Sequence, residues 1–150
     1  MTPEAMEHAV LIDANIALYA LSNTDPRKNP CREFLAALGH DGRHGYASTE
    51  LIQEVVHHRL RIVGNNARAV LEARKLATNL IVLNFDSEVL DIALNLIQDH
   101  AVRGRDAVHA ATALAYGIPA IASTDPAFDH VPGITRIDPT ARAAGATSSE

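Results

Sequence analysis

Short apolar runs alternate along this chain with longer segments in which apolar residues recur every three or four positions. The short runs lie at Val10 to Ile12, Leu80 to Leu83, Pro119 to Ala122 and Ile134 to Ile137, with a weaker one at Arg43 to Ala47. Runs of this length and composition are typical of strands that are buried in a parallel sheet. The pattern therefore predicts about five strands.

The segments between these runs carry the 3.6-residue period of amphipathic helices. Helices are predicted from Asp13 to about Ser22, from about Pro30 to before Gly39, from Ser48 to about Leu60, over Asn65 to Thr78, from Asp86 onward, and over Asp106 to Tyr116. Expected core-facing positions include Ala69, Val70, Ala73 and Leu76 in the fourth helix, and Val89, Leu90, Ala93, Leu94 and Ile97 in the fifth. Strands that alternate with helices in this way predict an α/β fold with a doubly wound parallel sheet and right-handed crossovers.

Length and composition indicate one domain. The chain has 150 residues, of which 47% are apolar, which suffices for a core without disulfides. We expect residues 1–8 to be a loose leader, residues 9–138 to form the domain, and residues 139–150 to be a disordered tail. A single cysteine, Cys31, and the lack of a long apolar run or a signal segment predict a cytoplasmic protein without a membrane span.

The net charge of −5 and the isoelectric point of about 5.9 argue against one class of function. A protein that coats nucleic acid needs a broad basic face to neutralise phosphates. A nuclease remains compatible with this charge, because a site that holds metal ions on carboxylates is locally acidic until the cations bind.

Four carboxylates are predicted to gather at one edge of the sheet. Asp13 follows the first strand, Glu54 lies in the helix after the second, Asp106 opens the last long helix, and Asp125 follows the fourth strand. Each one alone is more simply explained as a helix cap or a solvated side chain. Together they would repel one another unless a cation compensates, and oxygen ligands favour Mg²⁺ or Mn²⁺. Zinc is disfavoured, because the chain has one Cys and the adjacent His57 and His58 point in different directions on a helix.

The segments VLIDANI, STELIQEVVH, RGRDAVHAATAL and ASTDPAFD resemble, in order, the acidic motifs of PIN-domain ribonucleases, in particular VapC-type toxins of bacterial type II toxin–antitoxin pairs. This resemblance spans about Val10 to Ile137. It implies a three-layer α/β/α fold and an RNA-cleaving activity that needs one or two Mg²⁺ or Mn²⁺ ions. It also implies a homodimer, and a cognate antitoxin whose C-terminal segment lies over the acidic edge and inserts an Arg or Lys.

Carried over residue by residue, the resemblance assigns the catalytic and metal-binding roles to four acids and supporting roles to Asn15 and Ser123. The acids are Asp13, Glu54, Asp106 and Asp125. Arg105, which flanks the acids, is a possible further supporting residue. Two alternatives stay open. Glu50 lies four residues before Glu54 on the same helix face, although family spacing favours Glu54. Asp129 competes with Asp125, and we expect Asp129 to be a solvated turn residue.

Several basic residues flank the acids. His109 follows Asp106 by one helical turn and could act as a general base, although a hydrogen-bonded packing role is the simpler expectation. Four arginines could hold RNA phosphates or could form a solvated rim: Arg59, Arg61, Arg103 and Arg105.

Two rival functions are less consistent with the sequence. A receiver-like phospho-switch domain also gathers aspartates at this edge, but it needs a lysine at the end of the last strand, and the only lysines are Lys28 and Lys75. An inactive PIN-like binding module is disfavoured because all four acids are intact. The pattern therefore favours in-line attack of water on a phosphodiester, with cations that the carboxylates hold.

Overall fold

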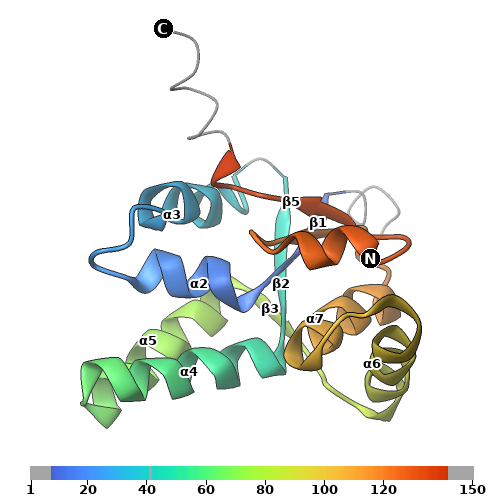
Figure 1. Ribbon diagram of the computed structural model, residues 1–150. Helices are drawn as coiled ribbons and strands as arrows, with labels where there is room; N and C mark the ends of the chain where they lie inside the picture. Colours follow the sequence, from blue (N-terminus) through green and yellow to red (C-terminus); the bar gives the residue numbers. More distant parts are fainter. Residues whose placement is uncertain (1–7, 41, 142–150) are drawn as a thin grey trace, which may run out of the picture.

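Five parallel strands form the central sheet of the computed structural model, which describes residues 8–40 and 42–141 (Figure 1). The strands are β1 (Ala9–Ile12), β2 (His44–Ser48), β3 (Ile81–Leu83), β4 (Ala120–Ala122) and β5 (Thr135–Ile137). Their order is β3-β2-β1-β4-β5, and β1 pairs with both β2 and β4, so that Leu11 lies opposite Tyr46 and Ile121. The predicted parallel α/β sheet is confirmed.

Helices connect the strands and cover both faces of the sheet. They are α2 (Ala14–Leu21), α3 (Lys28–Ala37), α4 (Thr49–Val63), α5 (Asn66–Asn79), α6 (Ser87–His100), α7 (Gly104–Ala115) and the 3₁₀ helix η1 (Pro126–His130). In Figure 1, α6 and α7 lie on one side of the sheet, while α2, α3, α4 and α5 lie on the other. This arrangement is the predicted three-layer α/β/α architecture.

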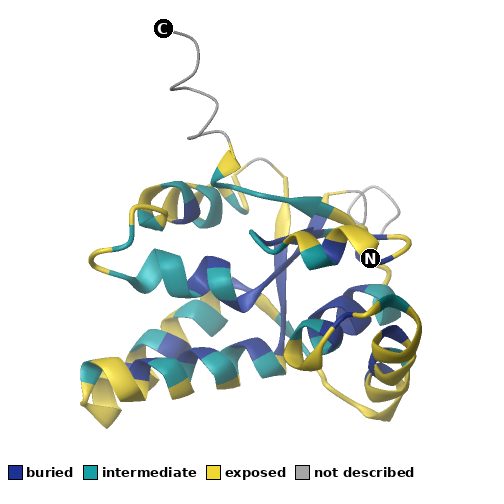
Figure 2. Ribbon diagram, viewed as in Figure 1, coloured by how far each residue is buried: buried dark blue, intermediate teal, exposed yellow. Residues whose placement is uncertain are grey.

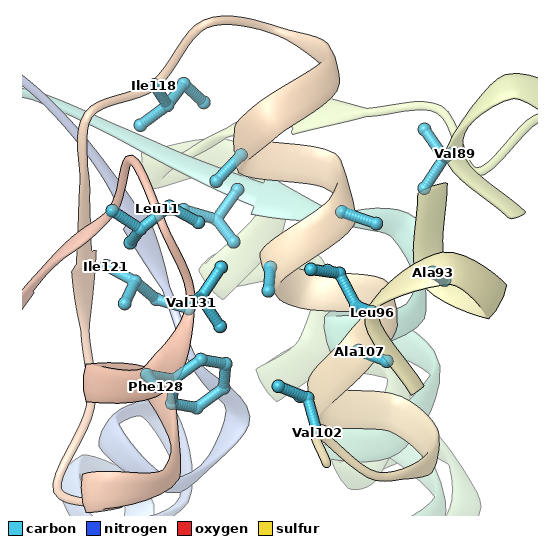
Figure 3. Packing of buried hydrophobic residues seen from close by; sticks show 14 of the residues in the cluster. Leu11, Val89, Ala93, Leu96, Val102, Ala107, Ile118, Ile121, Phe128 and Val131 are labelled. Carbon is cyan, nitrogen blue, oxygen red and sulfur yellow. The ribbon is translucent and has the colours of Figure 1, made fainter. Parts of the chain in front are cut away.

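Residues of β1 alternate between two hydrophobic cores, because successive side chains of a strand point to opposite faces. Ala9 and Leu11 pack with residues of α6, α7 and η1, among them Phe128. Val10 and Ile12 pack with residues of α2, α3 and α4. All four β1 residues are buried, as the continuous apolar run predicts for a central strand (Figure 2). Figure 3 shows the first core, in which Leu11, Ile121 and Phe128 lie beside the inner face of α7.

Polar caps start the helices where the sequence predicts them. The Ser48 hydroxyl accepts the Glu50 N–H at 3.1 Å, and Asp86 accepts the Val89 N–H at 3.0 Å. Helix α4 continues to Val63, three residues beyond the prediction, and ends at Gly64, which adopts a left-handed φ of 67°. Glycine takes this conformation without steric cost, so α4 and α5 are joined by a tight turn.

The predicted core face of α6 is partly wrong. Val89 and Ala93 are buried as expected, but Leu96 is the third inward residue, while Leu90, Leu94 and Ile97 are between 44% and 54% exposed. The helix has apolar residues on more than one face, so its period alone does not fix which face packs on α7. The prediction for α5 fails similarly at Val70, which is 39% exposed beside the buried Ala69 and Ala73.

Some predicted boundaries fall outside the described residues. The leader is described only at His8, and of the predicted tail only residues 139–141 are described. Within the described ranges, no helix combines the length and the apolar character that a membrane span requires.

Candidate active site

The carboxyl ends of β1 and β4 and the starts of α4 and α7 bring the four predicted acids to one edge of the sheet. Asp13 directly follows β1 and donates its backbone N–H to the Ala122 carbonyl of β4 at 3.0 Å. Glu54 lies in the second turn of α4, Asp106 in the first turn of α7, and Asp125 at the start of η1. Parallel strands gather their carboxyl ends at this edge, where ligands bind in open α/β sheets.

Asp13 is held by a buried hydrogen-bond network. Its carboxylate accepts the Ser123 hydroxyl at 2.6 Å and the Ala14 N–H at 2.8 Å. The Ser123 oxygen in turn accepts the Asp125 backbone N–H at 3.0 Å. One fully buried hydroxyl therefore connects the first and the last acid of the set, and it fixes the orientation of the Asp13 carboxylate.

Asn15 extends this network. Its side-chain amide donates to the Thr124 hydroxyl at 3.0 Å and, more weakly, to the Ser123 hydroxyl at 3.4 Å. The Asn15 carbonyl oxygen is buried, and it has no hydrogen-bond partner among the residues described. Thr124 is a member of the site that the sequence analysis missed, because a threonine in a loop carries no spacing signal.

His109 is the positive partner of Glu54. The side chain is fully buried, and its Nε2 lies 3.0 Å from Glu54 Oε1 and 3.9 Å from Asp13 Oδ1. Burial pulls the pKa of His109 down, but the hydrogen bond to Glu54 and the charges of Asp13 and Asp106 outweigh it and raise the pKa above its ordinary value. An imidazolium at this position offsets part of the negative charge and orients Glu54.

The carboxylates perturb one another. Burial raises the pKa of Asp106 to about 6, and the charges of Asp13, Asp125 and Glu54 add to that rise. Burial also raises the pKa of Asp13, although His109 and the two hydrogen bonds oppose it. Asp106 thus interacts electrostatically with the other three acids, as expected of a like-charge cluster.

Capping explains only part of this arrangement. Asp13 accepts the first backbone N–H of α2, and Asp125 accepts the Ala127 N–H at 2.9 Å in η1. Among the residues that the structure describes, Asp106 makes no such cap bond. The N-cap of α7 is Arg103, whose side chain makes no cap hydrogen bond. A structural explanation is therefore available for Asp13 and Asp125 but not for Asp106.

The two open alternatives are placed apart from the cluster. Glu50 lies 3.4 Å from Arg105 in an ion pair at the surface. Asp129 is about half exposed, and it receives a hydrogen bond of 2.9 Å from Arg136. The geometry therefore places Glu54 and Asp125, and neither competitor, beside Asp13 and Asp106. Arg105 is engaged with Glu50, and the arginine beside the cluster is instead Arg136, whose guanidinium donates to the Ser123 backbone carbonyl at 3.3 Å.

Arg59 does not occupy the solvated rim that the sequence suggested. It is buried, and its guanidinium pairs with Glu72 of α5 at 2.7 Å. Arg61 and Arg103 are exposed. The difference arises because α5 folds back against α4 and covers one flank of that helix, which a local pattern does not reveal.

The donor set suits a hard cation in kind, since it consists of carboxylate oxygens with a hydroxyl and an amide nearby. In this conformation the carboxylate oxygens do not point toward one common metal position. Among the residues described, no three His, Cys, Asp or Glu side chains are placed to hold a metal ion. Glu54 is turned to His109 and Asp13 to Ser123, so side-chain rotation would be needed to bring the oxygens onto one ion.

A family model described as the PIN domain matches residues 10–134, which is most of the chain. The chain belongs to the PIN-domain family. The match contains all four acids of this PIN domain and both of its hydrophobic cores except a few terminal residues.

Individual relatives resemble this PIN domain over most of their length. Ribonuclease VapC7 of Mycobacterium tuberculosis is 29% identical over 135 residues, which cover 88% of this chain and 92% of that protein. The DNA-bound VapBC structure from Salmonella typhimurium superposes with a TM-score of 0.70 at 18% identity, covering 87% of this chain and 98% of that chain. The structure of Mycobacterium tuberculosis VapC20, described as a sarcin–ricin loop cleaving toxin, superposes with a TM-score of 0.67 at 20% identity. The match covers 80% of this chain and 92% of that chain. At these identities the two structures establish the fold alone.

Proposed function

We propose that this PIN domain is a metal-dependent ribonuclease and the toxin of a toxin–antitoxin pair. The observation that carries the proposal is the electrostatic coupling of Asp106 to Asp13, Asp125 and Glu54 at the carboxyl edge of the sheet. Such repulsion opposes folding, and a cation that binds the clustered carboxylates would offset it. Membership of the PIN family and the likeness to a ribonuclease support the same function.

Asp13, Asp106, Asp125 and Glu54 are the residues that would hold Mg²⁺ or Mn²⁺. One or two such ions would stabilise charge on the phosphate and lower the pKa of the attacking water. The chain's own contribution is orientation. Ser123 holds the Asp13 carboxylate in place, and His109 holds Glu54 on the side of α4 that faces the cluster. Without a cation, burial and the neighbouring acids raise the pKa of Asp106 to about 6, and a bound cation would favour its ionised form.

The structures that this chain resembles indicate which proteins it would bind. The Salmonella and Haemophilus influenzae structures are VapBC assemblies, and the Klebsiella pneumoniae structure is a toxin–antitoxin complex. We propose that this chain likewise binds a cognate antitoxin, whose basic side chain would enter the acidic edge, and that it forms a homodimer. We propose that it acts in the cytoplasm, where cellular RNA would be its substrate.

The test is cleavage of total RNA by the purified protein with Mn²⁺ and, separately, with excess EDTA. Discrete fragments are expected only with the metal. The variant Asp106→Asn should lose activity by at least about a hundredfold, because it removes a charged ligand while it keeps the shape of the side chain.

Glu50→Gln is the matched control, since it removes one carboxylate charge from the same edge but outside the cluster. It should retain cleavage. Robust cleavage in EDTA, or equal losses in Asp106→Asn and Glu50→Gln, would contradict the metal site assigned to these four acids.

A further inference from the structure

A basic region lies on α4 and α5, beyond the acidic edge. Residues 57–75 contain a single acid, Glu72, in a chain whose net charge is −5. The basic residues of this segment are Arg59, Arg61, Arg68, Arg74 and Lys75, together with His57 and His58. The local charge is therefore opposite to that of the whole molecule.

A pocket of about 440 Å³ opens in this region, between the C-terminal ends of α2 and α4 and the start of α5. We name it the Arg68 pocket. Its polar lining consists of Ser22, Asn23, Thr24, His58, Arg59 and Arg68. Hydrogen-bond donors from the loop after α2, from α4 and from α5 therefore line one pocket. Such an arrangement is expected where a ligand presents several acceptor oxygens.

The donors of the Arg68 pocket are not all used within the protein. Glu72 binds Arg59 closely, at 2.7 Å, but meets Arg68 only at 3.4 Å, and the Arg68 side chain is 63% exposed. The Ser22 hydroxyl oxygen accepts the backbone N–H groups of Thr24 and Asp25, and within the described ranges the hydroxyl hydrogen has no acceptor, so it can donate outward. His58 Nδ1 is enclosed, and it has no hydrogen-bond partner in the part of the chain that the structure describes.

The pocket lies in line with the candidate active site. Glu54 and His58 are four residues apart on α4, so they share a helix face and are separated by about 6 Å along the axis. Asp13 and Ser22 bracket α2 at its two ends, about 13 Å apart by the same rise. Because α2 and α4 run side by side (Figure 1), the path from the carboxylates to the pocket follows both helices.

We infer that the Arg68 pocket binds a backbone phosphate of the RNA strand whose scissile phosphate lies at the carboxylates. The inference rests on the proposed ribonuclease function. A phosphate diester presents acceptor oxygens in several directions, which suits guanidinium, imidazole and hydroxyl donors that approach from three elements. A carboxylate of a protein partner would need only one guanidinium. The pocket would fix the direction of the strand and would select substrates long enough to reach it.

The test measures binding of a fluorescein-labelled random single-stranded 12-mer RNA to protein that carries Asp106→Asn, so that no cleavage occurs. Adding Arg68→Gln should weaken binding about tenfold, the value of a charged hydrogen bond. It should also reduce the slope of log Kd against log salt by about one. His58→Gln should weaken binding by a smaller factor. Arg59 is left intact, because its loss would remove the closer partner of Glu72 and leave that carboxylate only the 3.4 Å contact with Arg68.

Arg74→Gln is the matched control, because it removes the same charge from the same helix at an exposed position outside the pocket. Its effect should stay below about twofold. Equal weakening by Arg68→Gln and Arg74→Gln would overturn the inference in favour of diffuse attraction. So would an Arg68→Gln effect on the binding of a hexaglutamate peptide without an effect on RNA, which would assign the pocket to a protein partner.

Two further readouts separate this inference from the proposed function. The NMR resonances of the His58 ring in the wild type should shift on titration with inorganic phosphate, and Arg68→Gln should abolish that shift. An unchanged His58 spectrum would overturn the inference that the pocket binds phosphate. Cleavage of RNA by the wild type is scored independently, so that loss of the ribonuclease proposal and loss of the pocket are different results.

Discussion

Helix α4 carries Glu54 in its N-terminal half and Arg59 in its C-terminal half, and the two side chains have different surroundings. Arg59 is buried against Glu72, whose pKa is lowered by the hydrogen bond from Arg59, so this pair is mutually stabilised. Glu54 lies among further carboxylates, which raise the pKa of Asp106, and His109 is the one cationic side chain in contact with Glu54 within the described residues. Opposite charges are matched at one end, and like charges are concentrated at the other.

The charges around Arg59 stabilise the fold, whereas the charges around Glu54 suit a functional site. Charges that serve folding should be neutralised, because an uncompensated buried charge costs free energy. Charges that serve a cation or a substrate persist although they oppose folding. Removing one charge should therefore lower stability at the Arg59 end and raise it at Asp106.

The largest effect is expected from Glu72→Gln. Arg59 has a side chain that is only 7% exposed, and it would lose its compensating charge. The free energy of unfolding should fall by about 3 kcal/mol, as for other buried pairs that lose one partner. Urea denaturation at pH 7.5 measures this. The exposed Asp91→Asn is the charge-matched control and should change it by less than about 0.5 kcal/mol. A fall below 1 kcal/mol in Glu72→Gln would mean that solvent reaches the pair.

A smaller loss is expected from His109→Gln, which preserves a hydrogen-bond donor for Glu54 but removes the positive charge. We expect a decrease of about 2 kcal/mol, the value of a charged hydrogen bond. The pKa of His109 is raised in the folded protein, so its stabilisation is fully present below the unfolded value of about 6.5 and is lost as pH rises through the folded pKa. The gap between wild type and variant should therefore shrink from pH 6 to pH 9. A pH-independent gap would show that packing, and not charge, is what His109 supplies.

The opposite sign is expected from Asp106→Asn in EDTA. The pKa of Asp106 is raised to about 6 in the folded protein, against about 3.9 when unfolded, so ionisation of this group disfavours folding above that range. The variant should be more stable at pH 7.5 by about 1 kcal/mol, a value reduced from the full shift because the side chain is half-buried and screened.

This gain should shrink as pH falls below about 6, and it should vanish only near about pH 3, where the wild-type carboxyl is neutral in both the folded and the unfolded protein. Thermal melts at pH 7.5 and pH 4.5 test it. Adding Mn²⁺ should stabilise the wild type more than the variant, because only the wild type retains the full ligand set. Destabilisation of Asp106→Asn at pH 7.5 would assign Asp106 a structural role instead.

The smallest effect is expected from Glu50→Gln. Its ion pair with Arg105 is long, at 3.4 Å, and the Arg105 side chain is 61% exposed, so water screens the attraction. The free energy of unfolding should change by less than about 0.5 kcal/mol. A change above 1 kcal/mol would mean that Glu50 interacts with the acidic cluster, as Glu54 does.

Strand and helix positions were predictable because they depend on local periodicity. The five strands and the caps at Ser48 and Asp86 lie within a residue or two of their predicted places. The inward face of α6 was not predictable, since Leu90 and Leu94 are as apolar as the buried Leu96. Only the contact with α7 decides which of these faces is covered.

The sequence by itself determined the α/β order and the set of carboxylates, because strand ends, caps and motif spacings are local properties of the chain. Tertiary structure alone decided how these groups interact. It turned Glu54 toward His109, linked Asp13 to Asp125 through Ser123, and buried Arg59 against Glu72. Ser123 and Asp125 are two residues apart, but the partners in the other three contacts are 13 to 110 residues apart in the chain. Hydrogen bonds and pKa shifts depend on distances in space that only the packed helices and sheet establish.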